Sequence, residues 1–173
     1  MKTIIKFIFG LAIIAAAGYG VYLFIQQIGW KQVNLGQNYV ESEKIKMDLN
    51  GDGLEETIDF KNNSQFITIN NNEYVINKYF GEGMTNSSLQ FADLNEDKVL
   101  EIVHRTSSHA VSPAQNYYTI YNFTGSDLKE IGGISISGNP SAVFAKYNSI
   151  KFVYWPFESP EDNTEEVTFE LKL

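Results

Sequence analysis

A nine-residue acidic segment occurs twice in this chain, and the two copies start 45 residues apart. They read DLNGDGLEE from Asp48 and DLNEDKVLE from Asp93, and five of the nine positions are identical. Each copy leads into residues typical of a β-strand, Thr57-Ile58 in the first and Ile102-Val103 in the second. A repeat with a fixed period predicts a fold that is built from similar structural units.

The residues around these segments also favour β-structure. Beyond residue 30, short runs of β-forming residues alternate with clusters of Asn, Gly, Asp and Ser, and no segment shows a sustained helical period. Asparagine tolerates positive φ and bonds its own backbone, so these clusters are expected to form hairpin turns. The sequence therefore predicts an all-β domain of short antiparallel sheets, with strands at residues 57–61, 65–69, 74–79, 117–123, 128–136, 142–147, 151–157 and 167–173.

The oxygen-bearing residues of each acidic segment are spaced as in a loop that surrounds one hard cation. Side-chain oxygens stand at positions 1, 3 and 5, a backbone carbonyl at position 7 and a carboxylate at position 9. Calcium accepts about 6–8 oxygen ligands in flexible geometry, whereas magnesium demands a tighter octahedron. The predicted Ca²⁺ ligands are Asp48, Asn50, Asp52, the carbonyl of Leu54 and Glu56 in the first loop, and Asp93, Asn95, Asp97, the carbonyl of Val99 and Glu101 in the second.

Position 6 distinguishes the two loops. Gly53 permits a sharp turn in the first loop, whereas Lys98 strains the turn and adds a positive charge in the second. The second loop is therefore expected to bind Ca²⁺ more weakly or not at all. An EF-hand needs a Glu at position 12 between two helices, but Asp59 and His104 stand there between predicted strands. The alternative for both loops is a solvated acidic turn in which Asp and Asn only form the turn.

The segments DLNGDGLEETIDF and FADLNEDKVLEIVHR resemble the calcium loops of FG-GAP/VCBS repeats, the blades of integrin-type β-propellers. The resemblance implies four-stranded blades around an axis, calcium between the strands, and extracellular adhesion or ligand binding. A third copy at residues 144–148 is degenerate, because Lys146 replaces the first acid. Propellers typically have about 4–8 blades. Three repeats at most therefore imply an open or incomplete propeller, or a ring completed by several copies of the chain as a homo-oligomer.

The N-terminal segment is expected to be an uncleaved membrane anchor. Residues 7–25 carry no charge, and counted from Ile4 the apolar run is 22 residues long. Such a run is about 33 Å long as a helix, enough to cross a bilayer core of ~30 Å. Lys2 and Lys6 precede it, which predicts a cytoplasmic N-terminus and an extracytoplasmic C-terminal domain. A cleaved signal peptide is the alternative, because small residues occupy positions 15–18.

These observations predict a single-pass protein of the cell membrane. Residues 1–30 are expected to form the transmembrane signal anchor and residues 31–173 the exported all-β domain. The calcium-loop repeats of this domain are expected at about 44–90 and 91–140, with the degenerate copy at 141–173.

The charge of the chain narrows its possible partners. All 21 acidic residues lie after residue 30 together with 11 of the 13 Lys and Arg residues, so the exported part has a net charge of −10. This acidity argues against nucleic-acid binding, which needs a basic surface to displace counterions. The chain has no cysteine, so disulfides, thiolate zinc sites and cysteine nucleophiles are excluded.

No common catalytic motif is present in the sequence. His104 is expected to end the strand of the second repeat, and Arg105, Ser107, Ser108 and His109 are expected to lie in an exposed loop rather than in a catalytic group. The predicted function is therefore that of a bacterial cell-surface Ca²⁺-binding module for a protein or glycan ligand, without enzymatic activity. The alternatives are a surface hydrolase or accessory subunit whose site is shared with a partner, and a metal-free envelope protein.

Overall fold

The computed structural model describes residues 29–40, 44–60, 66–76, 84–108, 115–157 and 164–172. The predicted anchor lies outside the described residues, apart from its last two positions. Within the described residues, the structure contains no helix with the length and apolar character needed to span a bilayer.

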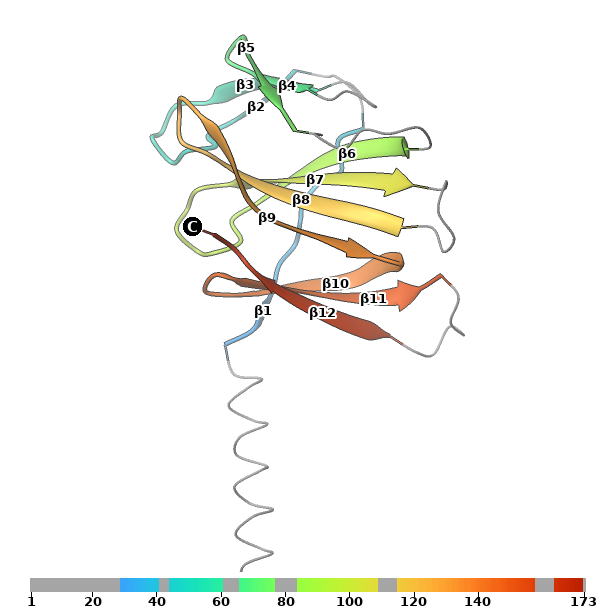
Figure 1. The fold of residues 1–173 in the computed structure, drawn as a ribbon. Helices are drawn as coiled ribbons and strands as arrows, with labels where there is room; N and C mark the ends of the chain where they lie inside the picture. The colour runs from blue at the N-terminus through green and yellow to red at the C-terminus, as the bar shows by residue number, and fades with distance from the viewer. Residues whose placement is uncertain are drawn as a thin grey trace, which may run out of the picture. The chain divides into compact units, whose positions relative to one another are not determined.

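Three four-stranded antiparallel sheets make up the described part of the chain, as the all-β prediction required (Figure 1). Each sheet is mostly a meander, in which strands that follow one another along the chain lie side by side. The first sheet consists of β2 (Ile45–Met47), β3 (Glu56–Phe60), β4 (Phe66–Ile69) and β5 (Asn72–Val75). The middle sheet consists of β6 (Met84–Ala92), β7 (Glu101–Ser108), β8 (Gln115–Phe123) and β9 (Leu128–Ile136). The third sheet consists of β10 (Gly138–Lys146), β11 (Ser149–Pro156) and β12 (Glu165–Glu170), with β1 (Lys31–Gln32) beside β10.

Tight turns explain why consecutive strands pair. The β4–β5 hairpin turns at Asn70 and Asn71, whose φ angles are 50° and 67°. Two successive residues with positive φ match the twist of the flanking strands, and asparagine adopts this conformation more readily than most residues. The β8–β9 hairpin likewise contains Gly125 at a φ of 88°. The predicted turns at these two places are confirmed.

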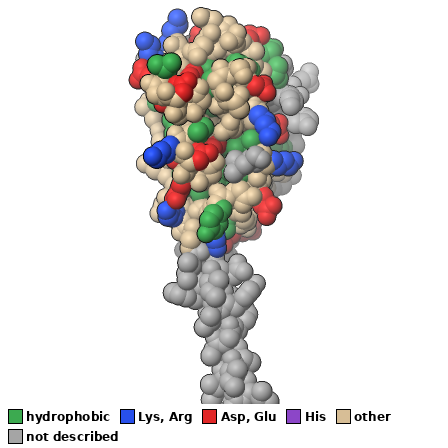
Figure 2. All heavy atoms as spheres, turned by 90° about the vertical axis from the view of Figure 1, so that its left-hand side faces the viewer, with side chains coloured by type: hydrophobic (Ala, Val, Ile, Leu, Met, Phe, Trp, Pro, Cys, Tyr) green, Lys and Arg blue, Asp and Glu red, His purple; other side chains and the backbone are tan. Residues whose placement is uncertain are grey.

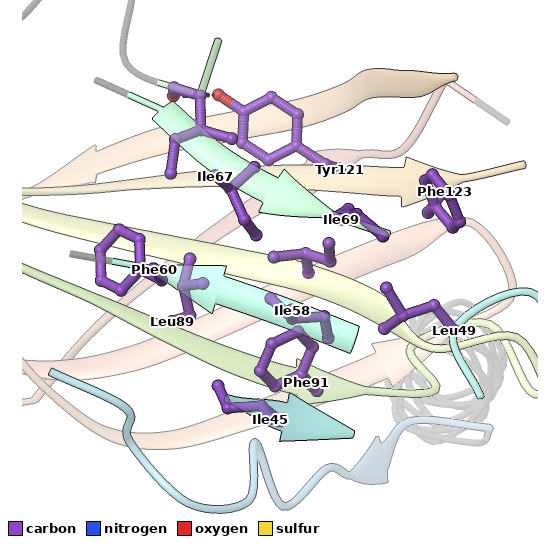
Figure 3. Close-up of a cluster of buried hydrophobic side chains, with 12 residues drawn as sticks. Ile45, Leu49, Ile58, Phe60, Ile67, Ile69, Leu89, Phe91, Tyr121 and Phe123 are labelled. Atoms are coloured by element: carbon purple, nitrogen blue, oxygen red, sulfur yellow. Dashed lines mark hydrogen bonds between the residues drawn. The ribbon is translucent and has the colours of Figure 1, made fainter. Parts of the chain in front are cut away.

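The middle sheet is covered on both faces. Side chains alternate along a strand, so Ile102 on β7 belongs to one buried cluster and the adjacent Val103 to the other. The first cluster joins the first and middle sheets (Figure 3) and contains Ile45, Leu49, Ile58, Phe60, Ile67, Ile69, Ile76, Leu89, Phe91, Ile102, Tyr121 and Phe123. The second cluster joins the middle and third sheets and contains Ala92, Leu94, Val103, Tyr118, Ile120, Ile131, Ile136, Val143, Ala145, Ile150, Phe152 and Leu171.

The β7 strand is longer than the sequence predicts. It continues past His104 to Ser108, so the expectation of an exposed loop directly after His104 is wrong. Thr106 and Ser107 pair with β6 on one side and with β8 on the other, and their side chains are buried. Small polar residues favour loops when nothing satisfies their hydroxyl groups, but here Ser107 Oγ donates to Asn116 Oδ1 at 2.7 Å.

His104 is a buried titratable group of the first cluster. Its side chain is 2% exposed and lies edge-on to the ring of Phe60, with 6.0 Å between the ring centroids. Burial lowers the pKa of its imidazole from 6.5 to about 4, although a hydrogen bond with the backbone of Ile76 acts in the opposite direction. The imidazole is therefore neutral at pH 7.

We expect His104 to make the fold sensitive to acid. Between pH 6.5 and about 4 the unfolded chain binds a proton at this site and the folded chain does not, so the free energy of unfolding falls as the pH drops through this window. A His104→Phe variant should lose this part of the pH dependence. Urea unfolding of both proteins across the window measures the difference. Identical pH profiles would show that His104 is not desolvated.

Candidate metal site

The two acidic segments form loops in equivalent places of successive sheets. Residues 48–55 connect β2 to β3, and residues 93–100 connect β6 to β7. Both loops lie on the same side of the sheets, on the left in Figure 1. The corresponding connection in the third sheet, between β10 and β11, is a short turn at Tyr147 and Asn148. The sequence repeat therefore coincides with a structural repeat, and the degenerate copy has lost its loop.

The first Asp of each loop accepts hydrogen bonds from backbone N–H groups inside the loop. Asp48 Oδ1 accepts from Gly51 at 2.7 Å, and Asp48 Oδ2 accepts from Gly53 at 2.8 Å. In the second loop, Asp93 Oδ2 accepts from the N–H of Lys98 at 3.0 Å. These bonds fold each loop around the carboxylate at its start.

The Asn and Asp at positions 3 and 5 form a second shared arrangement. Asn50 Oδ1 accepts from the N–H of Asp52 at 3.0 Å, and Asn50 Nδ2 donates to Asp52 Oδ2 at 3.0 Å. Asp52 Oδ1 accepts from the N–H of Leu54 at 2.8 Å. Asn95 and Asp97 repeat all three bonds at 3.0, 2.9 and 2.8 Å. These three bonds are therefore the same in both loops, although the sequences differ at positions 4, 6, 7 and 8.

The Glu at position 9 closes each loop from its far end. Glu56 Oε2 accepts from the N–H of Leu49 at 2.8 Å, and Glu101 Oε2 accepts from the N–H of Leu94 at 2.7 Å. Both glutamates are buried, with exposed fractions of 4% and 0%. Within the described residues, Glu101 Oε1 is buried without a hydrogen-bond partner. A buried carboxylate oxygen without a donor is unusual, because its desolvation is left uncompensated.

The second loop concentrates negative charge around Glu101. Burial, together with the charges of Asp97 and Asp93, raises the pKa of the Glu101 carboxyl from 4.5 to about 7, while the Leu94 N–H bond opposes the shift. A cation bound at this place would remove the penalty, because it supplies the missing partner for the carboxylate.

The donor set fits a hard cation, but the described side chains do not converge on one point. Among the residues that the structure describes, no group of three Asp, Glu or His side chains is placed to hold a metal ion. Each carboxylate oxygen that accepts one N–H bond keeps further lone-pair capacity. The same bonds also suit the solvated-turn alternative, in which the acids serve only the backbone. Ligation by the ten predicted residues therefore stays a prediction.

The two loops touch each other. The N–H of Leu100 donates to the carbonyl of Leu49 at 3.1 Å. A Cβ placed on Gly51 would lie 3.5 Å from the carbonyl oxygen of Lys98. The first loop therefore packs directly against the second.

The comparisons with protein-family models, with curated proteins and with solved structures find no match for this chain. Its candidate sites therefore follow from its own residues. Besides the loops, the structure brings together Arg105 and Tyr118. The sequence predicts an exposed loop at Arg105 and no site at Tyr118, so it does not connect them. These two residues line a cavity on the middle sheet. Their pairing across β7 and β8 could have been found only with the correct strand ends.

Backbone strain distinguishes the loops, as position 6 predicts. Gly51 and Gly53 have φ angles of 73° and 86° in the first loop, and Glu96 and Lys98 have φ angles of 66° and 73° at the same positions of the second. Residues with a side chain pay roughly 1–2 kcal/mol in this region, which glycine adopts freely. The second loop therefore holds strain that the first does not.

We expect the residues at position 6 to be exchangeable with opposite effects on stability. Lys98→Gly should raise the free energy of unfolding by about 1 kcal/mol, because it relieves the positive φ, and Gly53→Lys should lower it by a similar amount. No atom lies within 4 Å of a Cβ on Gly53, so the backbone conformation alone sets its cost. Urea unfolding in EGTA measures both changes. A stabilising Gly53→Lys substitution would contradict the loop geometry.

Proposed function

We propose that this protein is a membrane-anchored, extracytoplasmic Ca²⁺-binding module of a bacterial cell surface, which binds a protein or glycan ligand. The observation that carries the proposal is the duplication of the loop: two oxygen-rich loops with five equivalent hydrogen bonds occupy equivalent places in two successive sheets. The uncharged run at residues 7–25, preceded by Lys2 and Lys6, supports the anchor and its orientation.

Calcium would act on the loops through their charge. Asp48, Asp52, Glu55 and Glu56 repel one another within nine residues of the chain. A bound dication neutralises this repulsion. In the second loop, Glu101 Oε1 offers an oxygen ligand that has no partner among the described residues. Because the folded chain binds the ion and the unfolded chain does not, free Ca²⁺ at ~100-fold above its Kd would add about 2.7 kcal/mol of stability.

The repeat of four-stranded meanders supports an FG-GAP/VCBS-like arrangement in an open or incomplete propeller. The three sheets follow one another along the chain, and the two loops project on one side. On the face shown in Figure 2, acidic and basic side chains are interspersed, so this face has no broad surface of one charge. Several copies of the chain would be needed to complete a ring.

Neutral substitutions of the glutamates separate metal binding from turn formation. Glu56→Gln and Glu101→Gln keep an oxygen that accepts the Leu49 or Leu94 N–H bond but lose the carboxylate charge. We expect Ca²⁺ to raise the Tm of the full chain, and Glu56→Gln to remove most of this rise, since the first loop is the stronger site. Glu101→Gln should have the smaller effect. Glu170→Gln, an exposed position outside both loops, serves as the charge-matched control.

Calorimetric titration of the full chain with CaCl₂ and with MgCl₂ gives the affinities. Tighter binding of Ca²⁺ than of Mg²⁺, weakened by Glu56→Gln and unchanged in the control, supports the metal site. Absence of binding heat together with an unchanged Tm would establish the solvated-turn alternative, in which both loops only connect strands.

A further inference from the structure

One face of the middle sheet changes from apolar to polar along its strands. Side chains that face the third sheet come from alternate residues of β7 and β8, which pair across the two strands. Both members of the first pair are apolar and belong to the second core cluster, whereas the next two pairs carry polar groups and only Tyr118 among them belongs to it. In order along the strands, the pairs are Val103 with Ile120, Arg105 with Tyr118, and Ser107 with Asn116.

A cavity of about 550 Å³ lies where this face becomes polar. Its walls come from β6, β7 and β8 of the middle sheet, from residues 140–143 at the start of β10, and from the N-terminal segment at residues 32–38. Sites for small ligands typically have about 300–1,000 Å³. Among the described residues of the lining, Arg105 alone is charged, in a chain with 21 acidic residues. The cavity therefore offers a local positive site within an acidic protein.

Arg105 is held in place by a neutral group. Asn116 Oδ1 accepts from Arg105 Nε at 3.2 Å, from Arg105 Nη2 at 3.0 Å and from Ser107 Oγ at 2.7 Å. Asn116 Nδ2 donates in turn to the carbonyl of Gly138 at 2.6 Å, which fixes the amide. The guanidinium group has five N–H donors, and in the described part of the chain no carboxylate pairs with it. Among the described residues, the charge of Arg105 is therefore oriented but not neutralised.

Tyr118 supplies a second donor beside Arg105. Its side chain is 1% exposed, and its hydroxyl is buried without a hydrogen-bond partner among the described residues. Burial raises the pKa of this phenol to about 12, although the charge of Arg105 acts against the shift, so the hydroxyl keeps its proton at neutral pH. A buried hydroxyl without a partner costs about 1–3 kcal/mol. A ligand oxygen would remove this cost, and because the hydroxyl is buried, the contact requires the Tyr118 side chain to shift toward the cavity.

We propose that the cavity binds a small molecule that carries a carboxylate, with the carboxylate on the Arg105 guanidinium and the Tyr118 hydroxyl. A planar guanidinium matches a planar carboxylate through two parallel hydrogen bonds. A single cation balances one negative charge, which favours a carboxylate over a phosphate dianion. Gln90 and Asn38 on the walls can bond hydroxyl or amide groups of the same ligand. This site goes beyond the proposed calcium module and does not need metal.

Two carboxylates and their uncharged counterparts test the site. D-glucuronate is compared with D-glucose, and N-acetyl-L-alanine with its methyl ester, by calorimetric titration of the full chain in mild detergent. EGTA is present throughout, so the outcome is independent of the calcium loops. We expect at least one carboxylate to bind about tenfold or more tightly than its counterpart, and the better binder distinguishes a sugar acid from a peptide C-terminus.

Variants of the two donors connect the binding to the cavity. Arg105→Gln should weaken carboxylate binding about tenfold or more, because it removes the charge. Tyr118→Phe should also weaken binding, but without loss of stability in the unliganded chain, since its hydroxyl has no partner to lose. Tyr121→Phe is the matched control on the same strand: its hydroxyl donates to the Ile76 carbonyl in the first cluster, so it should lower Tm and leave binding unchanged.

The following results would overturn the proposed carboxylate site. It fails if neither carboxylate binds, if the uncharged counterparts bind equally well, or if Arg105→Gln binds like the unaltered chain. A Tyr118→Phe variant that loses stability as Tyr121→Phe does would show that the Tyr118 hydroxyl has a structural partner instead of a ligand.

Discussion

Burial of the middle sheet on both faces is the constraint on which the rest of the structure depends. Adjacent residues of β7 belong to different cores, so neither the first nor the third sheet can be removed without exposing apolar side chains of the middle one. This arrangement accounts for the neutral His104 on one face and for the cavity on the other, where apolar packing gives way to Arg105.

The two acidic loops have positive φ angles at equivalent positions, although different residues occupy these positions. Glycines occupy the positive-φ positions of the first loop, whereas Glu96 and Lys98 occupy those of the second. Both loops nevertheless keep the hydrogen bond in which the N–H at position 2 donates to the carboxylate of the glutamate at position 9. That hydrogen bond closes both loops in the same way. It holds a buried carboxylate at the edge of each core.

Much of the fold could be predicted from the sequence, because β-forming runs and asparagine turns are local signals. The predicted strand at residues 128–136 coincides with β9, and the Asn70-Asn71 turn was found from composition. The end of β7 could not be predicted, since Thr106, Ser107 and Ser108 are typical of loops until their partners on β6 and β8 are known. The cavity at Arg105 could not be predicted either, because Arg105 lies on the same part of β7. The acidic loops were predicted from residue spacing alone, and their metal binding stays a prediction.

The strand at the start of the domain completes a sheet formed at the other end of the chain. Val33 donates its N–H to the carbonyl of Val143, 110 residues later, at 2.8 Å, and Tyr39 exchanges two backbone bonds with Leu89 of the middle sheet. The strands of the first and middle sheets instead pair with their neighbours along the chain. Pairing of this N-terminal segment with β10 therefore closes a loop of about 110 residues, which costs more chain entropy than the hairpins between consecutive strands.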